Sequence, residues 1–295
     1  MDYNEDIYWS LFPLITLNLI VCIAFVYFAI TYARRPKTAE ALERLKSNKS
    51  FLGLFLFEFG YWITMPFVRF YAFLKVTPNM ITALSIPMSL LTGFVIMIGK
   101  LEYAGWLIMI SGNMDLVDGL LARTTGKVTK SGAYFDACMD RYSDAFVMGG
   151  LGLYFIVKSN TVSSVYNAYN SCAYNSCNTS ILSKTFTASA FDVAMLITSI
   201  LLIAGTSAMS YAKARGEIAG VSTKRGFMQR QERVITLGLV LILFPFMKVV
   251  CDNNDWNADY LLAGILVLMT VLVNLSAIIR TVDVFSKIKK MENNN

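Results

Sequence analysis

Apolar blocks of about 20 residues recur along this chain, and they constrain its fold more than any other feature. A block of this length crosses the hydrocarbon core of a bilayer as a helix. The first block covers residues 9–32, and six more lie at about 80–98, 101–122, 133–157, 191–212, 231–250 and 257–282. Only 16% of the residues are charged, against about 25% in soluble domains. The sequence therefore predicts an all-α integral membrane protein, with a six-helix transmembrane core and an extra N-terminal transmembrane helix.

Residues 51–76 form a block of a different kind. They are apolar and dense in aromatic residues, but Glu58, Pro66, Arg69 and Lys75 interrupt them. This mixture is typical of an amphipathic helix that lies at the membrane surface. We therefore expect an interfacial helix here, and one more transmembrane span is the alternative.

Lys and Arg residues gather in alternate gaps between the blocks, and this pattern sets the expected orientation. The basic segments are 33–50, 123–132, 213–233 and the C-terminal tail, whereas 1–6, 99–100, 158–190 and 251–257 fall on the other side. Because basic loops stay in the cytoplasm, the N-terminus is expected outside. The expected domains are an N-terminal anchor and cytoplasmic linker (1–50) and a second domain (51–295), whose polar segment 158–190 forms a loop outside the cytoplasm.

The composition excludes several classes of function. The chain has five cysteines, no Cys-x-x-Cys motif and no histidine, which argues against a zinc site and excludes Ser–His or Cys–His catalysis. The net charge is +6, but no basic patch is interleaved with aromatic residues outside the apolar blocks, so no nucleic-acid partner is expected.

Two pairs of aspartates stand where one predicted span ends and the next begins. Asp115 and Asp118 lie three residues apart, and Asp136 and Asp140 four apart, so each pair shares a helix face. Carboxylates facing one another at membrane depth repel and need cations between them. Oxygen ligands without His or Cys favour Mg²⁺ or Mn²⁺.

Small and basic residues accompany the aspartates. Gly119 and Ala122 are small enough for a facing helix or a substrate to approach closely, and Arg123 is a fixed cation suited to phosphate. Carboxylates, a divalent metal and arginine at a membrane surface indicate phosphoryl-group chemistry on a lipid. A set of interfacial salt bridges is the alternative.

The full pattern is Asp-x2-Asp-Gly-x2-Ala-Arg-x8-Gly-x3-Asp-x3-Asp, over residues 115–140. It resembles the motif of the CDP-alcohol phosphatidyltransferases, and the resemblance extends over about residues 60–285. It implies a site for two metal ions, Mg²⁺ or Mn²⁺, held by Asp115, Asp118, Asp136 and Asp140, with Asp140 also acting as the catalytic base. Members of the family are often homodimers, which makes a second copy of the chain an expected partner.

The same resemblance implies the residues that bind the CDP-lipid donor. The segment TPNMIT at 77–82 is similar to the Pro-Asn segment of the family, which carries the role over to Pro78 and Asn79. Gly119, Arg123 and Thr129 fall where the family contacts CDP-diacylglycerol. The alternative for 77–82 is an ordinary turn and helix start.

The basic segment 210–233 bears on the acceptor alcohol. Its Ser-Tyr-x-Lys-Ala-Arg-x-Glu start resembles the prokaryotic phosphatidylinositol phosphate synthases, including those that act on archaeal lipids. This implies inositol phosphate as acceptor, with its phosphate bound by Lys213, Arg233 and Arg280. The end of the segment reads Gln-Arg-Gln-Glu-Arg at 229–233, where that group has a pattern like Glu-Arg-Pro-Glu-Arg.

Other functions stay open at this point. The nearest alternative keeps the chemistry and changes the acceptor to glycerol 3-phosphate, serine or free inositol. A remoter one is a transporter that uses intramembrane carboxylates to couple to cations, but such proteins have internally repeated halves, which this sequence lacks.

Single-cysteine labelling tests the orientation. In a cysteine-free background, Ser47→Cys and Ser222→Cys should be protected from an impermeant maleimide added to intact cells, because both lie in basic segments expected in the cytoplasm. Ser183→Cys should react. Reaction of Ser222→Cys from outside would overturn the orientation.

Overall fold

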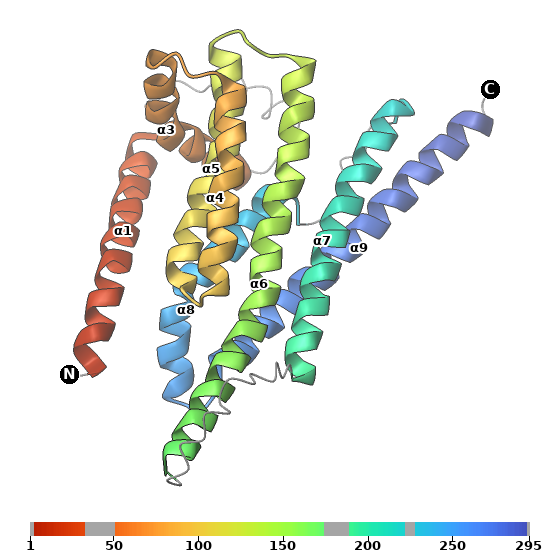
Figure 1. The fold of residues 1–295 in the computed structure, drawn as a ribbon. Coiled ribbons are helices and arrows are strands. Elements are labelled where there is room, and N and C mark those ends of the chain that lie inside the picture. Colours follow the sequence, from red (N-terminus) through yellow and green to blue (C-terminus); the bar gives the residue numbers. More distant parts are fainter. Residues whose placement is uncertain (1–2, 33–50, 174–188, 222–227, 294–295) are drawn as a thin grey trace. The chain divides into compact units, whose positions relative to one another are not determined.

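The structure is a computed structural model that describes residues 3–32, 51–173, 189–221 and 228–293. The described residues form helices connected by turns, with no strand among them. The helices are α1 (Tyr3–Tyr32), α3 (Phe51–Phe73), α4 (Pro78–Met97), α5 (Leu101–Thr124), α6 (Lys130–Ala173), α7 (Ala190–Ile218), α8 (Arg230–Asp252) and α9 (Ala258–Asn293) (Figure 1). The predicted all-α fold is confirmed.

Four helices are long and apolar enough to cross a membrane by length and composition: α4, α7, α8 and α9. In the described part of α1, the apolar stretch is the shorter Leu19–Tyr32. Helices α5 and α6 carry the aspartates of the motif, which lower their hydropathy. The predicted number of spans therefore stays a prediction, as does the place of α3 at the membrane surface.

The segment expected as a loop at 158–190 differs from the prediction. Helix α6 runs without a break for 44 residues and ends at Ala173, so residues 158–173 are helical. The polar composition of this stretch suits a helix that continues beyond the bilayer, because a helix satisfies its own backbone hydrogen bonds in water and in lipid alike. Residues 174–188, and the predicted linker at 33–50, lie outside the described part.

Tight turns end several helices. Gly99 and Gly126 adopt left-handed backbone conformations with φ of 83° and 67°. In each turn the next amide N–H donates to a carbonyl five residues earlier, from Lys100 to Val95 at 3.1 Å and from Lys127 to Ala122 at 2.9 Å. Glycine is favoured there because it has no Cβ to clash. The Gly99 turn joins α4 to α5, and the Gly126 turn joins α5 to α6.

The chain divides into two compact units. Unit 1 comprises residues 1–82 and 113–132, and unit 2 comprises 83–112 and 133–295. In unit 1, Phe28 of α1 packs on Phe59 and Trp62 of α3, with ring centroids 5.4 and 5.5 Å apart. A second cluster joins α3, the first turn of α4 and the second half of α5, and its buried members are Val68, Ile81, Val117, Leu120 and Leu121.

Unit 2 has the polarity expected of a protein immersed in lipid. On α7, Ile197, Ile200 and Leu201 are exposed, whereas Ser199 and Thr206 are buried. In water this distribution would be unfavourable, because burial of hydroxyl groups costs free energy and exposed aliphatic groups gain nothing. In a bilayer, small polar residues at helix contacts are ordinary. Together with the apolar helices, this pattern confirms an integral membrane protein.

Glycines allow the helices of unit 2 to pack closely. A Cβ built on Gly150 of α6 would lie 2.4 Å from the carbonyl oxygen of Gly93 on α4, and one on Gly105 of α5 would lie 2.6 Å from the amide nitrogen of Ile242 on α8. Helices α7 and α9 also lie side by side (Figure 1). There the Asn274 side chain donates to the Leu201 carbonyl at 3.1 Å.

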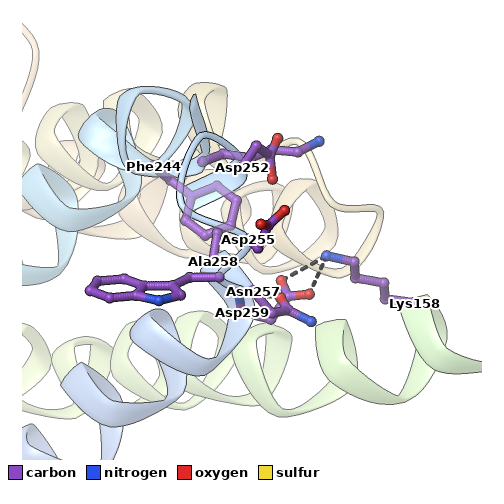
Figure 2. Close-up of a pocket in the computed structure, with 9 residues that line it drawn as sticks. Lys158, Phe244, Asp252, Asp255, Asn257, Ala258 and Asp259 are labelled. Atoms are coloured by element: carbon purple, nitrogen blue, oxygen red, sulfur yellow. Dashed lines mark hydrogen bonds and ion pairs between the residues drawn. The ribbon is translucent and has the colours of Figure 1, made fainter. Parts of the chain in front are cut away.

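At one end of unit 2, a charged contact joins α6 to the first turn of α9. The Lys158 ammonium lies 2.6 Å from the Asp259 carboxylate, which also accepts from the Tyr154 hydroxyl at 2.9 Å. Figure 2 shows this pair beside a cavity of about 370 Å³ that Asp255 and Asn257 also line. Residues 158 and 251–259 therefore share one end of the unit, as the charge pattern predicts.

Adjacent glycines give a test of the α4–α6 contact. Gly150→Ala should lower the free energy of unfolding by about 1–3 kcal/mol, because the added methyl group meets backbone atoms that cannot move aside. Gly149→Ala is the matched control, since nothing described lies within 4 Å of its Cβ position, and it should gain up to about 1 kcal/mol of helix propensity. Thermal unfolding in detergent would measure both, and equal melting temperatures would contradict the contact.

Candidate active site

Asp118 is the most deeply buried aspartate of the motif, with 5% of its surface exposed. It lies on α5 in unit 1, one turn after the half-buried Asp115. The Thr82 hydroxyl, from the first turn of α4, donates a short hydrogen bond to the Asp118 carboxylate. The same hydroxyl lies 3.2 Å from the carbonyl of Pro78, the first residue of α4. The start of α4 thus fixes the orientation of Asp118.

Two of the residues predicted to bind CDP, Asn79 and Thr129, come together at the start of α6, also in unit 1. The Thr129 hydroxyl accepts from the Gly132 N–H at 3.0 Å and so caps the helix. A Cβ on Gly132 would lie 2.9 Å from the Thr129 hydroxyl oxygen and 3.2 Å from the Asn79 amide oxygen. Gly132 is therefore needed for these two side chains to come together, next to a helix N-terminus that favours anions.

Arg123 folds back along α5 toward Gly119. Its guanidinium nitrogen would lie 3.8 Å from a Cβ on Gly119, the nearest described atom. In the described residues of unit 1 no neighbouring helix comes that close, so the expectation that Gly119 admits a facing helix stays a prediction. The small side chain leaves open space beside Arg123, which is consistent with a substrate contact.

Asp136 and Asp140 lie one turn apart on α6, in unit 2. A guanidinium nitrogen of Arg230, the first residue of α8, lies 2.8 Å from the Asp140 carboxylate. One turn further along α6, Asp144 lies 3.9 Å from Arg230 and 2.7 Å from Arg233. Helices α6 and α8 are thus joined by two carboxylates and two guanidinium groups.

The residues predicted to bind the acceptor phosphate have different environments. Arg233 is 3% exposed and Arg280 is 7% exposed. Arg280 donates to the carbonyl of Met209 on α7 at 3.3 Å. Lys213, one turn after Met209, is exposed and lies 4.0 Å from Glu217. The structure therefore buries Arg233 and Arg280, both in unit 2, and leaves Lys213 at the surface.

Contacts at the start of α8 account for the Gln-Arg-Gln-Glu-Arg sequence. The Glu232 carboxylate accepts from the Gln229 N–H at 2.9 Å and stabilises the first turn. Arg230 and Arg233 make the ion pairs with α6. The residues shared with the synthase pattern, Arg230, Glu232 and Arg233, thus make these ion pairs and the contact that caps the first turn.

Sequence reasoning missed Thr82 and Asp144 as site residues. Thr82 lies four residues after Pro78, on the same face of the first turn of α4, and Asp144 continues the four-residue spacing of Asp136 and Asp140. Both spacings were readable signals. What the sequence does not give is the partner, which comes from another helix in each case.

Comparison with known proteins assigns the family. The model of the CDP-alcohol phosphatidyltransferase family matches residues 75–272, and this chain belongs to that family. It is therefore a transferase of phospholipid biosynthesis.

Two curated relatives have related names. The archaetidylinositol phosphate synthase of Pyrococcus horikoshii is 26% identical over 216 residues, which cover 73% of this chain and 83% of that protein. The phosphatidylinositol phosphate synthase of Corynebacterium glutamicum is 27% identical over 189 residues, covering 62% of this chain and 73% of that protein.

Solved structures confirm the fold. The phosphatidylinositol phosphate synthase of Mycobacterium tuberculosis with CDP-DAG bound is 24% identical, with a TM-score of 0.53, covering 76% of this chain and 94% of that one. The same enzyme in complex with manganese and citrate is also 24% identical, with a TM-score of 0.55 and coverage of 75% and 88%.

The contact between Thr82 and Asp118 gives a test of the metal site. Thr82→Val should raise the concentration of Mg²⁺ or Mn²⁺ needed for half-maximal activity by about 10–100-fold, because the hydroxyl that orients the carboxylate is lost. Thr92→Val is the matched control, since its buried hydroxyl bonds only the Met88 carbonyl of the same helix, at 2.7 Å. Equal metal dependence in both variants would contradict a role for Thr82.

Proposed function

We propose that this protein transfers a phosphatidyl group from a CDP-lipid, such as CDP-diacylglycerol, to a hydroxyl of inositol phosphate and releases CMP. The observation that carries the proposal is the pair of buried arginines, Arg233 and Arg280. A buried guanidinium group is stabilised by an anion that it can bind. A phosphate on the acceptor is such an anion. Inositol phosphate and glycerol 3-phosphate both carry one, whereas serine and free inositol carry none, so the choice between the first two rests on the names of the relatives.

The names of the relatives support the same acceptor. The relatives of Pyrococcus horikoshii and Corynebacterium glutamicum are both named as inositol phosphate lipid synthases. The departures of this chain from the pattern of those enzymes, at Gln229 and Gln231, fall outside the contacts that Arg230 and Arg233 make. The acceptor assignment therefore does not depend on those two positions.

The donor is proposed to bind through unit 1. Asn79 and Thr129 meet at the N-terminus of α6, and Arg123 lies beside the open space over Gly119. These groups suit the phosphates and ribose of a CDP group, and Pro78 fixes the turn that presents Asn79. The relative solved with CDP-DAG bound supports this class of donor.

Asp115, Asp118, Asp136 and Asp140 are proposed to hold two Mg²⁺ or Mn²⁺ ions. The residues fit this role, since they supply only oxygen ligands and Asp118 is buried and fixed by Thr82. A relative solved in complex with manganese supports the choice of metal. Bound metal would neutralise the phosphates and polarise them for displacement.

The residues of this chain then have distinct roles. The acceptor hydroxyl forms a bond to the β-phosphorus of the donor while the bond from that phosphorus to CMP breaks. Asp140 is proposed to take the hydroxyl proton, and its ion pair with Arg230 orients its carboxylate. Arg233 and Arg280 hold the acceptor by its phosphate, together with Lys213 at the surface.

We propose from the charge pattern that the protein lies in the cell membrane with its active site facing the cytoplasm. Within unit 2, Asp140 contacts Arg230 at the start of α8, whereas Lys158 contacts Asp259 at the start of α9. The first pair borders segments expected in the cytoplasm and the second borders segments expected outside, in agreement with the positive-inside rule. A homodimer is proposed only because members of the family are often homodimers. Family membership leaves no support for the transporter alternative.

An acceptor panel tests the proposal. Purified protein with CDP-diacylglycerol and Mg²⁺ or Mn²⁺ should release CMP with inositol phosphate, and far more slowly with free inositol, serine or glycerol 3-phosphate. Arg233→Gln or Arg280→Gln should raise the acceptor KM about tenfold, because a charge-assisted contact contributes about 1.5–3 kcal/mol. The KM of the CDP-lipid should stay unchanged.

Two controls accompany this panel. Asp115→Asn removes a proposed metal ligand and should abolish CMP release, which shows that the signal comes from the motif. Lys213→Gln should have a smaller effect than Arg280→Gln, because exposed charges are screened. Equal use of serine or free inositol by the wild type would overturn the inositol phosphate assignment in favour of another alcohol.

A further inference from the structure

Arg233 is nearly surrounded by protein, so its contacts set its direction. One guanidinium nitrogen donates to Asp144 at 2.7 Å, and another donates to the carbonyl of Met228 at 3.1 Å. Its Nε atom is buried and has no hydrogen-bond partner among the described residues. The two contacts thus fix the plane of the guanidinium group and leave the buried Nε–H uncommitted.

Asp144 also reaches the neighbouring arginine. Arg230 lies 3.9 Å from Asp144, and its other side binds Asp140 at 2.8 Å. Asp144 therefore lies between the arginine proposed to bind the acceptor phosphate and the arginine that holds the proposed base. All of these groups belong to unit 2.

Of the two contacts that hold Arg233, the one with Asp144 is the ion pair. Without Asp144, the carbonyl of Met228 alone would hold the guanidinium group among the described residues.

We propose that Asp144 is a positioning residue of the acceptor site, which aims Arg233 at the acceptor's phosphate. It acts through Arg233 and does not touch the substrate. This inference rests on the proposed function, since it presumes an acceptor that carries a phosphate. A carboxylate beside an anion site is unfavourable unless it orients the cation, which is the role that its 2.7 Å contact allows.

Whether Asp144→Asn raises or lowers the acceptor KM distinguishes a positioning role from an effect of charge alone. Loss of the carboxylate makes the cluster more positive, so an effect of charge alone would lower the acceptor KM. A positioning role predicts that the acceptor KM rises about tenfold or more, while the KM of the CDP-lipid stays within about twofold. Initial rates of CMP release by the purified full-length protein would measure both constants.

A double-mutant cycle tests whether Asp144 acts through Arg233. If it does, Asp144→Asn combined with Arg233→Gln should raise the acceptor KM no further than Arg233→Gln alone. If the two effects multiply, Asp144 acts independently and the inference fails. An acceptor KM that is unchanged or lower in Asp144→Asn would overturn it as well.

Asp259→Asn is the matched control. Asp259 is an aspartate of similar exposure, 16% against 14% for Asp144, and it binds Lys158 at 2.6 Å in the same unit (Figure 2). The Asp259→Asn protein should be less stable, because an ion pair is lost, but its KM values for the acceptor and for the CDP-lipid should be unchanged. If Asp144→Asn does not fold, Asp144→Glu keeps the charge and moves it by one methylene group, and the same rise in the acceptor KM is expected.

The wild-type assay separates the two failures. A wild type that uses only unphosphorylated alcohols overturns the proposed function, and this inference with it. A wild type that uses inositol phosphate, with an acceptor KM unchanged in Asp144→Asn, overturns this inference alone.

Discussion

Charged side chains in an apolar helical protein must satisfy one another, and this constraint organises the site. An isolated carboxylate or guanidinium group in such surroundings is strongly unfavourable, whereas a paired one is tolerated. The structure meets the constraint on unit 2 by joining Asp140 and Asp144 of α6 to Arg230 and Arg233 of α8. On unit 1 it buries Asp118 against the Thr82 hydroxyl. The direction of each functional group thus follows from its partner.

Partners can be this close because small residues bring the helices together. At Gly150 the α6 backbone reaches that of Gly93 on α4, and at Gly105 the α5 backbone reaches α8. A bilayer provides little hydrophobic drive for helices to associate, so close van der Waals packing of this kind holds them. The exposed aliphatic side chains face the lipid, and the largely apolar interior also holds hydroxyl and charged groups such as those of Ser199, Thr206 and Arg233.

The sequence was sufficient for the class of fold and for the motif, because both depend on local spacing. Runs of apolar residues predict the helices, and the three- and four-residue spacings of Asp115, Asp118, Asp136 and Asp140 place each pair on one face. The predicted end of this helix, at residue 157, was wrong, because a polar helix that continues beyond the bilayer has no apolar run to reveal it. The contacts of Arg233 with Asp144 and of Thr82 with Asp118 join residues 89 and 36 positions apart, and no local pattern specifies such pairs.

The division of the chain bears on how donor and acceptor preferences can change. The residues proposed for the donor, Asn79, Arg123 and Thr129, belong to unit 1, and those proposed for the acceptor, Arg233 and Arg280, belong to unit 2. In unit 1, Gly132 lets Asn79 and Thr129 come together, and in unit 2, Asp144 and the Met209 carbonyl bind Arg233 and Arg280. A change at Gly132 is therefore expected to act first on the donor residues, because a Cβ there would meet Asn79 and Thr129. A change at Asp144 is expected to act first on Arg233, because it removes the carboxylate that the guanidinium group binds.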